Sequence, residues 1–370
     1  MFQITFAQSN KIFKGQILSQ SDSLPVCNAH IYMKNSSIGT ISNQDGFFQL
    51  NIPEILTNDT MKISCIGFSN YNIHLKIGNG DMTIFLSSKT ALLPEITVTT
   101  INAKEIIKKS ISSFEKNYFQ KEIINDIYYR ETLKLDTNYV HYLEIAAEII
   151  DKGFDNDYLE RENYRDVFIK GKRMNLEKES TYNGQNGLFT IYWLNWAKGL
   201  LTKKALREYE FEYEGMTEYD DKPVIIISVK KENDTKSQLY ISNDDYAIVL
   251  IKSSLNNERQ SESKGKEKFW FLRLELYVDF RRVNNMWHIN SISDYRKSMN
   301  KNRNITESHR IINIIGVSFD RRENSIHKIN SETDLFAYPI PYNLDFWKTY
   351  NIPIATDEET RVRKLMEKEE

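Results

Sequence analysis

The chain has 370 residues, and its 49 lysines and arginines nearly balance its 51 aspartates and glutamates. Because this balance creates no strong field of one sign, it disfavours nucleic acid and anionic membrane surfaces as partners. No apolar run approaches the roughly 20 residues of a transmembrane helix, and the length favours two domains, each with its own core.

The first nine residues, 1–9, have the character of a signal-peptide remnant. The run Phe6-Ala7-Gln8 is similar to a cleavage site, although a basic head and most of an apolar core are missing. Residues Phe2 to Phe6 also fit a short first strand. Both readings remain open, and the first would make the protein exported.

Residues 10–88 alternate short apolar-polar runs with turn residues, a pattern that predicts a seven-stranded β-sandwich. The clearest stretch is Ile38 to Leu50, where two alternating runs flank a turn from Asn43 to Gly46. This arrangement predicts a tight antiparallel hairpin. The seven runs read FKGQIL, NAHIYMK, IGTIS, GFFQLNI, MKISCIGF, YNIHLKI and DMTIFLS.

Several of these features occur together in the order typical of one family. They are Gly15, Pro25, Ala29 before IYM, Gly39-Thr40 with Ser42, Asp45-Gly46, Phe48, and Ser64 with Ile66-Gly67-Phe68. The first quarter of the chain therefore resembles the carboxypeptidase regulatory-like domain, a transthyretin-like sandwich. The resemblance implies an accessory domain of Bacteroidetes-type envelope proteins, in the periplasm or at the outer membrane, and it implies no peptidase activity.

Residues 89–119 form the expected linker. The run from Ala91 to Thr100 predicts a strand, and the run from Ile101 to Phe119 predicts an amphipathic helix that packs on the second domain. The apolar positions of this helix are Ile107, Ile111, Phe114 and Tyr118. Too little chain follows for the plug and barrel of a TonB-dependent transporter.

Residues 120–335 predict a larger antiparallel sheet, joined by turns such as Asp220-Asp221 and Asn284-Asn285. The clearest strand is Phe269 to Val283, in which the even-numbered apolar residues from Trp270 to Phe280 should share one buried face. The other predicted strands are 127–135, 139–150, 208–213, 224–229, 238–242, 246–253, 287–295 and 305–319. The run from Leu188 to Tyr209 is expected to be helical or irregular and to lie across the sheet, and 256–268 to be a loop.

Residues 336–370 should form an aromatic, proline-rich extended tail, followed from Asp357 by a charged helix or a disordered end. The chain from Glu214 onward also resembles, more loosely, the C-terminal region of uncharacterised Bacteroidetes envelope proteins that carry the same N-terminal domain. The matching positions are Glu214-Gly215, Lys222-Pro223-Val224, Tyr240-Ile241, Asp244, Tyr246-Ala247-Ile248, Phe346-Trp347 and Tyr350-Asn351. That resemblance implies no activity.

His141 and Glu144 have the HxxE spacing of two zinc ligands, with His288 as a conceivable third. Residues i and i+3 of a strand face opposite sides, however, so the pattern favours an ordinary strand histidine that faces solvent or makes hydrogen bonds. Asp155 and Asp157 lack the offsets of a calcium loop. Asp220-Asp221 and Asp244-Asp245 lie between strands, where aspartate favours turns over glycosidase chemistry.

Two composition features leave alternatives open. Cys27 and Cys65 lack metal or redox spacing and are expected to be small core or surface residues, with a disulfide between them in an oxidising compartment as the alternative. The aromatic residues could line a groove for a glycan or acyl chain, or simply fill the core. The tryptophans concerned are Trp193, Trp196, Trp270, Trp287 and Trp347.

The sequence thus predicts a mainly β, non-catalytic envelope protein that acts by binding an apolar ligand or a protein partner. A possible partner is an outer-membrane protein, a lipid or a glycan. We assign no catalytic, metal-binding or cofactor-binding residue. The alternative is an enzyme, either a metallopeptidase or a glycan hydrolase, in the second domain.

Overall fold

A computed structural model describes residues 10–75, 81–89, 102–151, 153, 165–176, 187–188, 203–230, 236–255, 259–262, 268–320, 327–330 and 332–366. These residues are mainly β-structure, as the sequence predicts, and they form two compact units. Unit 1 contains the described residues as far as 89, together with 218–221 and 343–360, and unit 2 contains the rest.

Unit 1 is a sandwich of a three-stranded sheet, in the order β4-β1-β7, and a four-stranded sheet, in the order β3-β2-β5-β6. The inward side chains of both sheets share one apolar core, in which Ile17, Phe48 and Ile63 are fully buried. The prediction of seven strands is therefore confirmed. Their bounds are β1 Asn10–Ser19, β2 His30–Met33, β3 Gly39–Ile41, β4 Phe47–Pro53, β5 Thr60–Ser64, β6 Tyr71–His74 and β7 Met82–Leu86, with a 3-10 helix at Glu54–Leu56.

The turn at Asn43 to Gly46 is present, but it does not close a hairpin. The Asn43 side chain accepts hydrogen bonds from the backbone N–H groups of Asp45 and Phe47, at 3.0 and 2.9 Å, and Gly46 has a φ of +77°. The flanking strands β3 and β4 pair with β2 and β1 and so lie in different sheets. The predicted pairing is wrong because alternation specifies a half-buried strand and leaves its partner unspecified.

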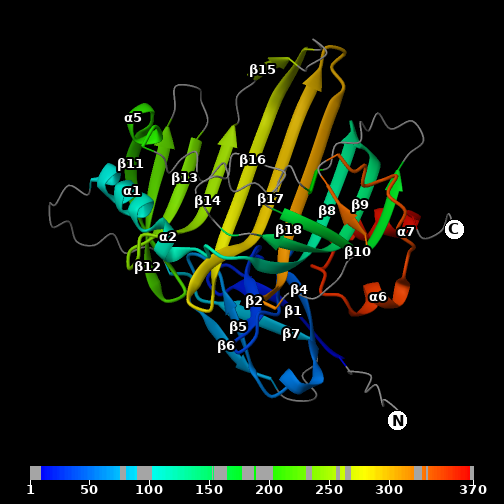
Figure 1. The fold of residues 1–370 in the computed structure, drawn as a ribbon, viewed down its shortest axis with the longest axis horizontal. Coiled ribbons are helices and arrows are strands. Elements are labelled where there is room, and N and C mark those ends of the chain that lie inside the picture. Colours follow the sequence, from blue (N-terminus) through cyan, green and yellow to red (C-terminus); the bar gives the residue numbers. More distant parts are fainter. Residues whose placement is uncertain are drawn as a thin grey trace. The chain divides into compact units, whose positions relative to one another are not determined.

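Unit 2 is built on an antiparallel sheet in the order β11-β12-β13-β14-β16-β17-β18-β8-β9-β10-β19, with β15 paired to β16 (Figure 1). The strand bounds are β8 Ile123–Leu135, β9 Asn138–Asp151, β10 Arg165–Leu176, β11 Glu210–Tyr219, β12 Lys222–Lys230, β13 Lys236–Ser242, β14 Ile248–Leu255, β15 Arg259–Glu262, β16 Lys268–Val283, β17 Met286–Asn300, β18 Ile305–Ser318 and β19 Lys328–Ile329. The helices are α1 Ala103–Ser112, α2 Phe114–Asn117, α5 Ala205–Glu208, α6 Leu344–Thr349 and α7 Asp357–Met366; α6 belongs to unit 1.

The two predicted aspartate and asparagine turns are confirmed. Asp220 and Asp221 have φ angles of 55° and 58°, and Asn284 and Asn285 have 47° and 64°. Two successive left-handed residues make the turn that suits the right-handed twist of a hairpin, and Asn and Asp tolerate this conformation better than most residues.

Strand β16 departs from the predicted alternation. A bulge between Phe271 and Arg273 shifts the register on β17, so Trp270 pairs with Met299 whereas Leu274 pairs with Arg296. Met299 and Arg296 are three residues apart on one strand and face opposite sides, so Trp270 and Leu274 do so too. The prediction of a single apolar face along β16 is wrong because an extra residue reverses the alternation at the bulge.

The linker helix packs on the sheet of unit 2, as predicted, but it is broken at Ser113 into α1 and α2. Tyr118 follows α2, and its hydroxyl donates to the backbone carbonyl of Ile248 at 2.7 Å. Its ring also contacts Phe280 edge-on at 5.7 Å. In α1 the buried stripe is Ala103, Ile106, Ile107 and Ser110.

The tail contains one helix where an extended segment was predicted. The side chain of Asn343 caps α6 by accepting a hydrogen bond from the backbone N–H of Phe346 at 3.0 Å. The predicted charged helix from Asp357 is present as α7. Cys27 is exposed and Cys65 is buried, and both are free thiols. The predictions for residues 1–9, for 91–100 and for most of 188–209 lie outside the described residues.

Candidate functional site

The candidate site lies where strands β8, β9 and β10 form one end of the sheet of unit 2 (Figure 1). Glu144 of β9 stands between Arg130 of β8 and Arg173 of β10 in register, so the three share one face. On this face Tyr142 precedes Glu144 by two residues. The register therefore gathers polar side chains that are far apart in the sequence.

Glu144 is completely buried and accepts hydrogen bonds from four side chains. Arg363 of α7 donates at 2.7 Å and Tyr142 at 3.1 Å, and Arg173 and Tyr128 donate as well. Burial acts to raise the pKa of Glu144, but the charges of Arg363 and Arg173 outweigh it and lower the pKa to about 2. The carboxylate is thus held ionised.

The opposite face carries a second buried carboxylate, Glu131. Arg310 donates to it at 3.0 Å, the hydroxyl of Tyr129 donates at 2.6 Å, and His141 Nε2 lies 3.8 Å away. Burial acts to raise the pKa of Glu131, and the neighbouring His141 and the charge of Arg310 lower it to about 2. Gly187 lies against this cluster, and a Cβ there would come within 2.3 Å of the Tyr129 hydroxyl oxygen.

The HxxE residues do not converge. Glu144 contacts Arg173 on one face, whereas His141 contacts Glu131 and the ring of Phe336 on the other. His141 is buried beside Glu131, so of the two environments expected for a strand histidine it has the one with polar contacts and not the solvent-facing one. Within the part of the chain that the structure describes, no three His, Cys, Asp or Glu side chains gather closely enough to hold a metal ion.

His288 lies in a separate environment. Its Nε2 is 2.7 Å from the side-chain oxygen of Asn125, and burial together with the charge of Arg281 lowers the pKa of His288 to about 3. The ring is therefore neutral at physiological pH, and the hydrogen bond to an amide oxygen requires Nε2 to carry the proton.

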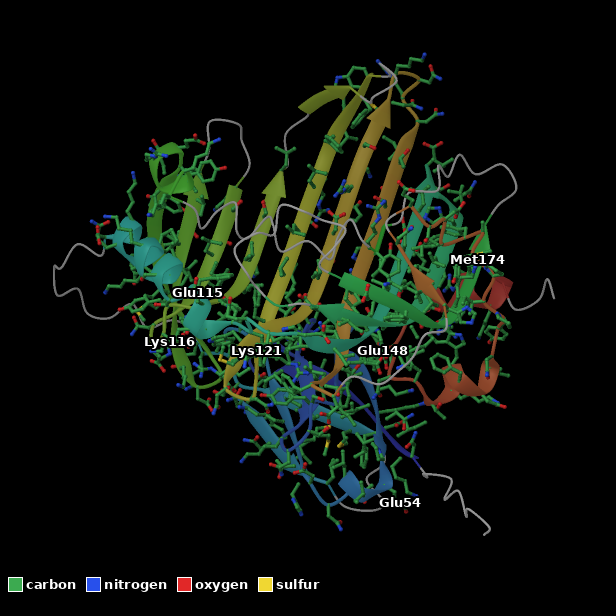
Figure 2. The ribbon with its side chains drawn as sticks, in the orientation of Figure 1. Glu54, Glu115, Lys116, Lys121, Glu148 and Met174 are labelled. Carbon is green, nitrogen blue, oxygen red and sulfur yellow. The ribbon has the colours of Figure 1, made fainter. Side chains whose placement is uncertain are left out.

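A pocket of about 380 Å³ lies at the exposed end of the sheet, beside β10. Met174 of β10, labelled in Figure 2, is 38% exposed and forms part of its wall. The lining residues are Lys172, Arg173, Met174, Phe336, Ala337, Tyr338, Pro339, Ile340, Tyr342 and Arg363. Small-molecule sites in proteins typically combine apolar walls with a few fixed polar groups in a cavity of this size.

The extended segment after Asp334 is fixed to β10 by Lys172. The ammonium group of Lys172 donates to the backbone carbonyls of Leu335 at 3.2 Å and Phe336 at 3.1 Å, and also to that of Tyr338. Burial lowers the pKa of Lys172, and the charge of Asp334 opposes this. One wall of the pocket is thus built by a lysine that binds main-chain oxygens.

The two acidic pairs considered in the sequence are turn residues. Asp220-Asp221 and Asp244-Asp245 both lie in turns, as predicted. Asp245 accepts hydrogen bonds from the side chains of Trp287 at 2.9 Å and Arg282 at 2.7 Å. Trp287 and Trp347 are buried and Trp270 is half-buried, while Trp193, Trp196, Asp155 and Asp157 lie outside the described residues.

The sequence reasoning missed the residues of the pocket. Lys172, Arg173 and Arg363 lie in charged runs that carry no motif, and β10 itself was not predicted. The aromatic, proline-rich run of the tail was noticed, but only as a segment that packs on the core. A weak signal for β10 was the short apolar run Val167-Phe168-Ile169 before Gly171.

Comparisons with known proteins add to this picture. A family model described as a CarboxypepD_reg-like domain matches residues 13–98, which confirms the resemblance of the N-terminal part. No curated protein matches the sequence. No helix among the described residues is long and apolar enough to span a membrane.

Two kinds of solved structure share a loose likeness with the chain. The LolA superfamily protein NE2245 from Nitrosomonas europaea is 9% identical, with a TM-score of 0.24 over 60% of this chain and 96% of that one. MucB in complex with MucA(peri) is 8% identical, with a TM-score of 0.20 over 59% and 94%. The MucA/MucB complex of Pseudomonas aeruginosa is 6% identical, with a TM-score of 0.17 over 60% and 99%.

Proposed function

We propose that this chain is a non-catalytic binding protein of the cell envelope. In this proposal unit 1 is an accessory sandwich that docks to a partner, and unit 2 binds a ligand with an apolar part in the pocket beside β10. The observation that carries the proposal is the pocket itself. Its aromatic and aliphatic walls enclose about 380 Å³ next to cationic side chains that the surrounding structure holds in place.

The protonation states of the buried groups support binding over catalysis. A general acid or base works best when its pKa lies near the operating pH. The pKa values of Glu131 and Glu144 are lowered to about 2, and that of His288 to about 3. None of these groups exchanges a proton readily at neutral pH, which counts against the hydrolase alternatives.

A metallopeptidase remains the alternative with a direct test. Stoichiometric zinc in the purified protein that is lost on His141→Ala would overturn the proposal. We expect no such metal, because His141 and Glu144 face opposite sides of β9.

Unit 1 also presents a surface that suits docking. Phe47 pairs with Gln16, and Phe85 pairs with Leu18 two residues further along β1, so both rings lie on the outer face of the three-stranded sheet. They are 42% and 47% exposed. The match to a regulatory-like domain supports an accessory role for this unit. A pull-down from envelope fractions should recover a partner that is lost with Phe47→Ser/Phe85→Ser and kept with Ile55→Ser, because Ile55 is exposed outside this face.

Mass spectrometry of molecules that co-purify with the full chain tests the ligand half of the proposal. We expect a retained small molecule that disappears when Ala337→Trp fills the pocket, because Ala337 lines it. Lys301→Trp, which places the same ring in an exposed turn, should leave the ligand bound. A ligand that survives the filling of the pocket, or an empty protein, would contradict this assignment.

A further inference from the structure

We propose that the pocket beside β10 selects a small amphiphilic anion, namely a carboxylate or phosphate head group on a short apolar chain. This inference rests on the proposed function and specifies its ligand.

The charges around the pocket do not cancel. Three of its lining residues, Lys172, Arg173 and Arg363, are basic, and none is acidic. Glu144 is the carboxylate that both arginines contact, so one negative charge faces two positive ones. Asp334 is a carboxylate that acts on the lysine. The residues that line the pocket are therefore basic in part and apolar in part, and none of them is acidic.

Arg363 also has a hydrogen-bond donor without an acceptor among the described residues. One terminal nitrogen of its guanidinium donates to Glu144 at 2.7 Å, and the same nitrogen lies 3.5 Å from the hydroxyl of Tyr142. Its Nε is buried and has no acceptor among the residues that the structure describes. A buried donor without an acceptor is unfavourable, and the planar guanidinium matches the oxygens of carboxylate and phosphate groups. The Arg363 side chain is 18% exposed and lines the pocket, so an anionic oxygen in the pocket can pair with the accessible part of the guanidinium, whereas a hydrocarbon cannot.

The apolar walls set the rest of the ligand. The pocket also has apolar lining residues, to which Met174 adds a flexible apolar side chain. The others are Phe336, Pro339, Ile340 and Tyr342. The volume of about 380 Å³ equals about a dozen water-sized volumes of ~30 Å³. An eight-carbon chain with its head group fits this space, and the end of a longer chain could extend from the open side.

Isothermal titration of the full chain with four matched probes tests the selection. The probes are octanoate, octyl phosphate, octanol and octylammonium, which share one chain and differ in the head group. We expect at least one of the two anions to bind ten-fold or more tightly than octanol, and octylammonium to bind most weakly. Comparison of octanoate with octyl phosphate then identifies the head group.

Equal affinities for octanol and the anions would overturn the inference but leave a binding pocket. Binding of none of the probes would also overturn it, and the co-purification experiment would then judge the proposed function separately.

Variants localise the effect. Arg363→Gln should weaken anion binding ten-fold or more and leave octanol binding unchanged, whereas Arg361→Gln, an exposed neighbour on α7, should change neither. Because Arg363→Gln also disturbs Glu144, a second pair avoids that network. Ala337→Glu should weaken anion binding by a similar factor relative to Ala337→Gln, which has nearly the same size without the charge. Equal anion affinities for the two Ala337 variants would overturn the inference.

Discussion

Replacement of Glu144 by glutamine should destabilise unit 2 in a way that depends on pH. Glu144 is fully buried and accepts hydrogen bonds from Arg173, Arg363, Tyr128 and Tyr142. Glutamine keeps the size and one acceptor oxygen but removes the charge. Two half-buried arginines then lose the buried carboxylate that compensates them, which is the costly way to break an ion pair with a buried partner.

The size of the effect follows from the lowered pKa of Glu144. A fall from the ordinary 4.5 to about 2, at about 1.4 kcal/mol per pH unit, corresponds to about 3 kcal/mol of stabilisation by the ionised form. Removal of one partner of a buried pair typically costs about 3 to 5 kcal/mol. We therefore expect Glu144→Gln to lower the free energy of unfolding by about 3 kcal/mol at pH 7.

The stabilisation by Glu144 should decrease as the pH falls. Because the pKa is lower in the folded state, the unfolded chain binds the proton more readily. The stabilisation is complete above pH 4.5 and is lost as the pH falls toward 2. The difference between wild type and Glu144→Gln should therefore be constant from pH 8 to about 5 and should shrink steadily below that.

Urea unfolding of both proteins across this pH range measures the difference. Glu212→Gln is the matched control. Glu212 is exposed, forms an ion pair with Lys230 and lies near the charge of Lys236. It should change stability little at any pH. A difference for Glu144→Gln that stays the same down to pH 2.5 would refute the argument that the carboxylate is held ionised by the arginines.

Three further predictions concern other parts of the chain. Asp245→Asn should cost about 1 to 2 kcal/mol in urea unfolding, because Asp245 accepts hydrogen bonds from Trp287 and Arg282. Gly46→Ala should cost about 1 to 2 kcal/mol and lower the melting temperature, because the φ of +77° is unfavourable for a residue with a Cβ. His288 should show no titration by NMR between pH 8 and 5, because its pKa lies at about 3. Since the unfolded chain binds this proton more readily, the contribution of His288 to the free energy of unfolding should fall as the pH drops below 6.5.

Each of these has a clear contrary outcome. Unchanged unfolding of Asp245→Asn would mean that the turn is held by other contacts. A neutral Gly46→Ala would mean that the turn relaxes to another conformation. Movement of the His288 ring signals near pH 6.5 would mean that water reaches the ring.

Several features of this protein were determined by the sequence alone, because they are local. Alternation of apolar residues marks a half-buried strand, and Asp220-Asp221 and Asn284-Asn285 mark turns because their side chains tolerate a left-handed backbone. The linker helix was likewise visible from the spacing of its apolar residues. These signals need no knowledge of the partner strand.

Tertiary structure alone decided the pairing and the pocket. The strands on either side of Gly46 were both predicted, yet they join different sheets, because β1 and β2 offer them partners in opposite layers of unit 1. A single extra residue near Arg273 reversed the faces of β16. Neither the choice of partner strand nor the bulge alters the composition of a strand or the apparent period of its apolar residues.

The clearest case is β10, which the sequence did not reveal. Its cations find their counter-charges only in the folded chain, since Lys170 pairs with Asp126 of β8 and Arg173 pairs with Glu144 of β9. Arg363 arrives at the same carboxylate from α7, more than 200 residues further along the chain. A buried charge is stable only where its counter-charges are brought to it, and that condition is set by long-range contacts that no local pattern encodes.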